Sequence, residues 1–243
     1  MNHCKNCNEP LNGNYCSNCG MPATLKRIDG RYIVQEIGDF FLANRGMLYT
    51  IKNILISPGK SVRAFIAEDR YRFVKPITFL FITSLVYTLV CYLCHIGADD
   101  FYLQPLPEGM ELRTFKLVMS WMISYSGYSQ IISGLLVAFL IKIFFRKTGY
   151  NIFEIFILLC FVSGISALYS CFVVVAQSLT HLDLLHITGL ISMIYYAWAI
   201  GQFFDKRRMS SYIKAFISCL LGYFLFGVMV AFITVFIDLI ILN

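Results

Sequence analysis

The sequence predicts an all-α membrane protein, in which a small cysteine-rich head precedes a bundle of five spanning helices. The chain has 243 residues, 58% of them hydrophobic, and its mean hydropathy is +0.68. Charged residues make up 14% of it, against about 25% in soluble domains, so a soluble core of this size cannot bury the apolar side chains. Five apolar runs also exceed the roughly 18 residues that a membrane helix needs.

The head, residues 1–24, holds four cysteines as two C-x2-C pairs separated by eight residues: Cys4, Cys7, Cys16 and Cys19. Each pair presents two thiolates from one tight turn, and Zn²⁺ prefers four such ligands in a tetrahedron. So short a segment has no core of its own, so bound metal would supply most of its folding energy. We therefore predict a structural Zn²⁺ site. Two disulfides are the alternative, and they require an oxidising compartment.

The head also resembles the minimal zinc ribbons found at the N-termini of many bacterial membrane proteins. The resemblance lies in Cys4-Lys5-Asn6-Cys7 and in the run Tyr15-Cys16-Ser17-Asn18-Cys19-Gly20. The chain departs from that pattern at Asn8, where such ribbons usually carry glycine. The departure leaves all four sulfur ligands in place.

Residues 25–75 are predicted to form an interfacial arm and a basic collar. Within 36–56, apolar residues recur at helical steps: Ile37, Phe40, Phe41, Leu48, Ile51 and Leu55. This pattern predicts an amphipathic helix, which either lies in the membrane interface or packs on the ends of the other helices. Ser57 is then expected to cap a new helix that starts at Pro58. Val62, Phe65 and Ile66 would share one face of that second helix.

Five basic residues define the collar: Lys60, Arg63, Arg70, Arg72 and Lys75. Uncharged apolar sequence begins directly after them at Pro76. Their positive charge is sufficient as a determinant of membrane topology. A grip on anionic lipid headgroups, at about 1 kcal/mol per residue near the surface, is the second interpretation.

Residues 76–243 are predicted to form the membrane domain. Its expected spans are 76–97, 127–145, 152–176, 185–204 and 212–242. The second span lies in a run of 25 residues without a formal charge. The first part of that run, 115–126, is expected to be an interfacial or tilted portion.

The distribution of basic residues predicts how the chain crosses the membrane. The collar precedes the first span, Arg146 and Lys147 follow the second, and 206–208 (Lys-Arg-Arg) follow the fourth. The opposite loops carry few basic residues, which predicts a cytoplasmic N-terminus and an external C-terminus. A cytoplasmic head agrees with thiolates rather than disulfides. The first 30 residues have no apolar segment typical of a cleavable signal peptide.

Few polar residues of the membrane domain indicate chemistry. Glu154 opens the third span, where a carboxylate is stabilised by the helix dipole. Alternatively it faces the bundle interior as a proton or substrate site, with Lys142 lining the path. Cys91 and Cys94 form a C-x-x-C, but apolar buried thiols are usually inert. The other polar residues, Gln130 among them, look scattered, and the small residues within 163–170 indicate close helix packing.

Four stretches resemble a family of bacterial membrane proteins of unknown function that carry an N-terminal zinc ribbon. They are Gly46-Met47-Leu48-Tyr49-Thr50-Ile51-Lys52, Pro58-Gly59-Lys60-Ser61-Val62-Arg63, residues 69–80 (DRYRFVKPITFL) and Gly149-Tyr150-Asn151-Ile152-Phe153-Glu154. The resemblance implies the same plan of a ribbon followed by membrane helices. It implies no reaction.

Together these observations predict an all-α polytopic helical membrane bundle with five spans and a small N-terminal zinc ribbon. The expected location is the bacterial inner membrane, in contact with its lipids. The closed four-thiolate shell predicts a ribbon that docks a cytoplasmic protein partner. A transporter with a site near Glu154, or a membrane-organising protein, is the alternative. No enzyme is expected, because the spacing shows no nucleophile–base pair or phosphate loop. Nucleic acid is not an expected partner, because the head has few basic residues.

Overall fold

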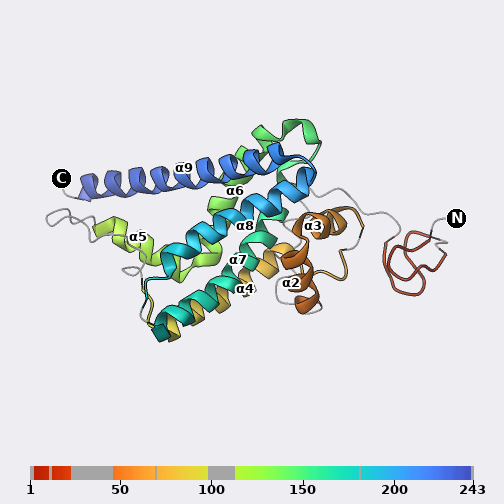
Figure 1. The fold of residues 1–243 in the computed structure, drawn as a ribbon, viewed down its shortest axis with the longest axis horizontal. Helices are drawn as coiled ribbons and strands as arrows, with labels where there is room; N and C mark the ends of the chain where they lie inside the picture. The colour runs from red at the N-terminus through yellow and green to blue at the C-terminus, as the bar shows by residue number, and fades with distance from the viewer. Residues whose placement is uncertain are drawn as a thin grey trace.

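The computed structural model describes residues 3–10, 13–22, 46–68, 70–97, 113–180 and 182–241. Within these ranges the chain forms α-helices and no β-strand, apart from isolated bridges in the head. Figure 1 shows the helices as α2 (Met47–Ile56), α3 (Pro58–Ala67), α4 (Pro76–Leu93), α5 (Arg113–Ser124), α6 (Ser126–Phe144), α7 (Ile152–Thr180), α8 (Leu185–Asp205) and α9 (Met209–Ile241). The predicted all-α class is confirmed.

Five of these helices are long and apolar enough to cross a membrane: α4, α6, α7, α8 and α9. Their bounds lie within a few residues of the predicted spans. The first ends at Leu93 rather than near 97, because His95 takes a positive φ of 55° and turns the chain. The predicted bundle of five spans is confirmed.

Helix α7 is the centre of the bundle and α9 is its most exposed helix. In the most apolar part of each, 67% of α7 is buried against 22% of α9. Helix α7 contacts α4, α6 and α8, whereas α9 packs on α6 and α8 and leaves its other side open (Figure 1). The apolar outer side of α9 therefore has the exposure expected of a helix that faces lipid.

Helices α4 and α7 pack closely at a glycine. A methyl group at Gly164 would lie 2.5 Å from the ring of Phe79, so only glycine fits there. Nearby, the Phe161 ring packs against Phe65, Phe73 and Phe79 at centroid distances of 5.3, 6.3 and 5.8 Å. The small residues predicted to allow close packing therefore do so at Gly164.

Helix α5 is a separate element rather than the beginning of the second span. The chain breaks at Tyr125, and Trp121, Tyr125 and Tyr128 form a row of exposed, neighbouring rings. Thr114 of α5 donates a hydrogen bond to Asp238 of α9. Exposed Trp and Tyr are typical of the interface between membrane and water, so the expected interfacial portion at 115–126 corresponds to α5.

Helix α2 packs on the protein through a different face from the one that the apolar pattern indicated. Residues 37–45 lie outside the described part of the chain. Thr50 and Ile54 are fully buried, whereas Leu48 is 82% exposed and Leu55 50% exposed. Two polar contacts set this orientation: the Thr50 hydroxyl accepts the N–H of Val74 at 2.9 Å, and the carbonyl of Ile54 accepts the hydroxyl of Tyr195 at 3.2 Å. Helix α2 is therefore held on α3 and α7, and its apolar outer face remains uncovered.

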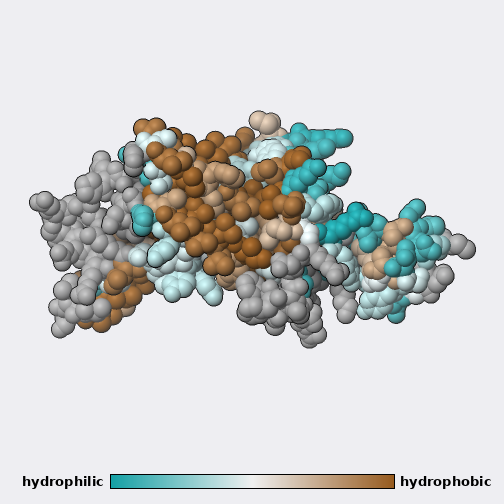
Figure 2. Space-filling model, turned by 90° about the horizontal axis from the view of Figure 1, so that it is seen from below, coloured by the Kyte–Doolittle hydropathy of each residue, from teal (hydrophilic) through white to brown (hydrophobic). Residues whose placement is uncertain are grey.

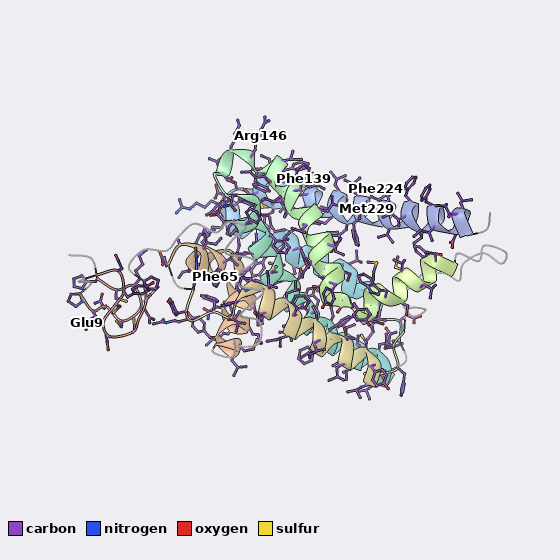
Figure 3. The ribbon with its side chains drawn as sticks, turned by 180° about the vertical axis from the view of Figure 1, so that it is seen from behind. Glu9, Phe65, Phe139, Arg146, Phe224 and Met229 are labelled. Atoms are coloured by element: carbon purple, nitrogen blue, oxygen red, sulfur yellow. The ribbon has the colours of Figure 1, made fainter. Side chains whose placement is uncertain are left out.

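The surface divides into an apolar band and a polar end. Figure 2 shows hydrophobic residues over the helical part, while hydrophilic residues gather at the N-terminal head and beside it. Figure 3 shows Phe65 within the bundle, and the exposed Phe139, Phe224 and Met229 lie on α6 and α9. A large exposed apolar band on a folded helical bundle is the signature of a membrane protein.

Candidate metal centre

The head consists of two turns of the same construction, twelve residues apart. In the first, Cys4 exchanges backbone hydrogen bonds with Glu9 and Asn8, at 2.8 and 2.9 Å. In the second, Cys16 does the same with Met21 and Gly20, at 2.7 and 2.9 Å. Each turn closes with an isolated bridge, His3 to Pro10 and Tyr15 to Pro22. The repeat therefore presents two pairs of cysteines that face each other.

Asn8 and Gly20 hold the same special position in the two turns. Their φ angles are 62° and 72°, both in the left-handed region. Glycine adopts this conformation freely, and asparagine is among the few other residues that tolerate it. The replacement of glycine by Asn8 is therefore compatible with the turn.

The four sulfur atoms form one compact cluster. All lie within 4.8 Å of one another, and three of their separations are 3.5 Å: Cys4–Cys19, Cys7–Cys16 and Cys7–Cys19. Four sulfurs at about 2.3 Å from a central Zn²⁺ would lie about 3.8 Å apart in a tetrahedron. All four predicted ligands are thus brought together at distances compatible with a metal site. Within the described residues this is the one cluster of potential metal ligands.

The electrostatics of the cluster favour a bound cation. A backbone N–H from Met21, opposed by desolvation and aided by Asn6 and the neighbouring thiols, lowers the pKa of Cys19 to about 6. The N–H of Glu9 likewise lowers the pKa of Cys7, but desolvation and hydrogen bonds from the other thiols outweigh it and raise that pKa to about 12. The thiolate of Cys19 is therefore favoured and that of Cys7 is opposed. A divalent cation removes this conflict, because it deprotonates coordinating thiols.

Among the described residues, a collar side chain, Arg72, contacts the head. Arg72 donates to the side-chain oxygen of Asn6 at 2.9 Å and to the carbonyl of Asn6 at 3.1 Å. Asn6 lies between the first two cysteines and also hydrogen-bonds Cys19. Arg72 therefore contacts the backbone loop that carries the cluster.

A second collar residue, Arg63, caps a membrane helix. One terminal nitrogen of its guanidinium donates to the carbonyls of Gln202 and Phe203, each at 2.6 Å. These carbonyls belong to the last turn of α8, which has no basic residue of its own. The last four carbonyls of a helix lack partners within it and carry its negative dipole. Arg63 therefore satisfies the C-terminus of α8 from α3.

The other basic residues of the collar differ in their contacts. Arg70 donates to the carbonyl of Ile66 at 2.9 Å, while Lys60 is exposed on α3. Ser57 holds the predicted N-cap position of α3, with Pro58 at the first position, but the Ser57 side chain makes no capping hydrogen bond. Instead the Ser61 hydroxyl donates to the carbonyls of Ser57 and Asn53, at 2.8 and 2.9 Å. Much of the collar is therefore engaged in protein contacts rather than held free for lipid.

Glu154 is used by the fold as a helix cap. Its carboxylate accepts the backbone N–H of Asn151 at 2.7 Å, and the Asn151 side chain accepts the N–H of Glu154 at 2.8 Å. This reciprocal pair has the form of a capping box at the start of α7. Lys142 donates to the carbonyl of Tyr150 at 2.5 Å and so holds the preceding loop. These contacts favour the structural interpretation of Glu154 and Lys142.

The C-x-x-C of the first span lies in an apolar setting. Cys91 is 3% exposed and packs with Val174 and Leu185. Cys94 sits at the end of α4 beside it. This burial agrees with the interpretation of both residues as packing groups.

Polar residues that looked scattered in the sequence converge on a cavity of about 360 Å³. The lining comes from α4, α6, α7, α8 and α9: Tyr87, Gln130, Ser166, Ala167, Ser170, Gly189, Ser192, Met193, Tyr196 and Tyr223. In α8 the lining positions recur at steps of three and four, which is a helical face. That periodicity of small and polar residues in α8 was the sequence signal that could have indicated this wall of the cavity. The partner helices were not predictable from it, since they meet α8 only in the tertiary fold.

Comparison with known proteins yields a partial match to one family and no function. Residues 44–88 match a family described as "Protein of unknown function (DUF3667)". The matched stretch spans α2, α3, the collar and most of α4, which includes three of the four stretches that carried the resemblance. No match is found among curated proteins or among solved structures.

Proposed function

We propose that this chain is an inner-membrane protein of bacteria whose zinc ribbon docks a cytoplasmic protein partner. The observation that carries the proposal is the closed cluster of four sulfurs, displayed at one end of the bundle and attached there by Arg72. Four cysteines fill a tetrahedral shell, which leaves no open position for a substrate. A structural and recognition role follows from that chemistry, rather than catalysis.

Zn²⁺ is the metal that we assign to the cluster. It prefers four-coordinate tetrahedral sulfur sites and has no geometric preference of its own to oppose the two turns. In the described part of the head, the core consists of Cys4, Cys16 and Met21 with the two other cysteines around it. Metal binding would therefore hold the head folded.

A protein is a better partner for the head than a nucleic acid. Within its described residues the head carries Lys5 and Glu9 as its charged side chains, which cancel. Such a surface lacks the positive charge that phosphate backbones require. Tyr15 is 68% exposed on the head, and exposed tyrosine is enriched at protein interfaces.

The orientation with the head in the cytoplasm is supported by where the basic residues lie. The head, α2, α3 and the loop at Arg146 share one end of the molecule, opposite the C-terminus (Figures 1 and 3). Positive residues of short loops remain in the cytoplasm. Reporter fusions test this: a fusion after residue 22 should be active only as a cytoplasmic reporter, and one after 241 only as an external reporter. The reverse pattern would contradict the orientation.

Photocrosslinking in living cells tests the docking proposal. A photoreactive residue replaces Tyr15, and as a control it replaces Leu182, which is 59% exposed at the connection between α7 and α8. We expect one defined protein adduct from position 15, none of it from position 182, and its loss when Cys16→Ser is added to a normally inserted chain. An adduct that survives Cys16→Ser, or the absence of any adduct at position 15, would contradict docking by the folded head.

A transport path through Glu154 has less support. Its carboxylate is committed to the cap of α7, and the ammonium group of Lys142 is committed to the carbonyl of Tyr150. A carboxylate that carries protons or substrate has to change partners during the cycle, which would uncap α7.

A further inference from the structure

The described residues that line the cavity in the membrane bundle are all neutral. Eight of its ten described lining residues carry a hydroxyl, an amide or a thioether, and none of the ten is charged: Tyr87, Gln130, Ser166, Ser170, Ser192, Met193, Tyr196 and Tyr223, with Ala167 and Gly189 completing the wall. Its volume of about 360 Å³ falls in the range of small-molecule sites. An ion would lose its hydration here without gaining a counter-charge, which is costly. The lining therefore selects for an uncharged ligand.

Part of this lining is held rigidly by its own hydrogen bonds. The hydroxyls of Tyr196 and Ser163 lie 2.6 Å apart. Tyr169 donates to Ser192 at 2.5 Å, and Ser192 donates in turn to the carbonyl of Thr188 at 2.8 Å. The wall formed by α7 and α8 is thus preorganised before any ligand arrives.

Two other lining groups have hydrogen-bonding capacity left over. The side chain of Ser170 is 8% exposed, and its hydroxyl makes no hydrogen bond to any described residue. The Gln130 amide likewise has no partner among the described residues. Other serines of the bundle, such as Ser133, satisfy the hydroxyl on a carbonyl of their own helix. A ligand that supplies partners to these two groups at the cavity wall gains affinity from the added hydrogen bonds.

We propose that this cavity binds a neutral lipid of the bilayer through a head that carries hydroxyl or carbonyl groups. The Gln130 amide and the Ser170 hydroxyl hydrogen-bond the head, and the apolar tail follows the bundle surface. The site lies among helices of membrane-spanning length, so the bilayer is the nearest source of a ligand. The proposal is independent of the zinc ribbon, whose variants leave this cavity unchanged.

Photolabelling of the full-length protein in phosphatidylcholine nanodiscs tests it. The probe is mono-oleoylglycerol with a diazirine in its chain, and the adducts are mapped by mass spectrometry. The competitors are unlabelled mono-oleoylglycerol, oleate and glycerol. We expect adducts on the lining segments of α7 and α8. Unlabelled mono-oleoylglycerol should compete with this labelling at a concentration at least tenfold lower than oleate or glycerol requires.

Two glycines supply a matched pair of variants. A side chain at Gly189, which lines the cavity, or at Gly227 on α9, which does not, meets open space. Gly189→Phe should reduce labelling at least fivefold and Gly227→Phe should leave it unchanged. Gln130→Leu, which adds no bulk, should weaken labelling as well.

Three results would overturn the proposal. Labelling that is spread over the exposed face of α9, or equal in Gly189→Phe and Gly227→Phe, would show only partition into the bilayer. Oleate competing as well as mono-oleoylglycerol would refute selection for a neutral head. Glycerol competing equally well would refute a bilayer lipid as the ligand. The mapping on the wild-type chain decides the matter even if a variant fails to fold.

Discussion

Replacing Arg63 tests whether the collar holds the membrane bundle together. The variant Arg63→Met keeps the apolar stem and removes the guanidinium that caps α8. Arg63→Lys retains the charge on a shorter side chain with an ammonium group in place of the guanidinium. Lys60→Met is the matched control, because Lys60 is a basic residue of the same helix with an exposed side chain.

The magnitude follows from the contacts that are lost. Hydrogen bonds from a charged donor contribute about 1.5–3 kcal/mol, and a cation at a helix C-terminus adds about 0.3–1 kcal/mol. Because Arg63 is half-buried, water will re-solvate part of the exposed α8 terminus. We therefore expect Arg63→Met to lower the free energy of unfolding by about 2–4 kcal/mol. Arg63→Lys should lose about half of that, and Lys60→Met should stay within about 0.5 kcal/mol of wild type.

The assay is reversible unfolding by SDS in mixed micelles, followed by the far-ultraviolet helical signal. The three variants are compared with wild type at one detergent composition. If Arg63→Met and Lys60→Met have the same free energy of unfolding, the capping of α8 by Arg63 contributes nothing. The collar would then be only a determinant of topology.

The structure supports three further predictions. Gly164→Ala should destabilise the bundle by about 1–3 kcal/mol, because its methyl group overlaps the Phe79 ring, whereas Gly134→Ala, with ordinary contact at 3.6 Å, should be tolerated in the same SDS assay. Asn8→Ala should weaken Zn²⁺ binding in competition with a chelator, and Asn8→Gly should not, because the position requires a positive φ; equal affinities would refute this. Glu154→Ala should lower the free energy of unfolding by about 0.5–2 kcal/mol, because α7 loses its cap. A specific transport defect in a variant of normal stability would restore the transport hypothesis.

The fold class and the four cysteines were predictable from local signals. Hydrophobic runs of membrane length indicate the spans without any tertiary information. The two C-x2-C pairs likewise indicate one cluster, because a single pair provides only half of a tetrahedral shell. The structure confirms five apolar helices of spanning length and places Cys4, Cys7, Cys16 and Cys19 together.

Features that depend on contacts between distant parts of the chain were not predictable from the sequence. Arg63 is separated from its acceptor Gln202 by 139 residues, so its role as a cap for α8 has no local signature. The face of α2 is set by a buried hydroxyl, Thr50, while the more apolar Leu48 points away. The neutral cavity is assembled from five helices, each of which contributes too few polar residues to stand out.

Metal analysis of the purified full-length protein tests the central claim most directly. Wild-type chain prepared without a metal-affinity tag is compared with Cys16→Ser by elemental mass spectrometry, with helical content checked in both. We expect one Zn²⁺ per chain in the wild type, and loss of that Zn²⁺ from a Cys16→Ser chain whose membrane helices remain folded. A wild-type protein without bound Zn²⁺, or a Cys16→Ser chain that keeps it in full, would contradict the assignment of this head as a zinc ribbon.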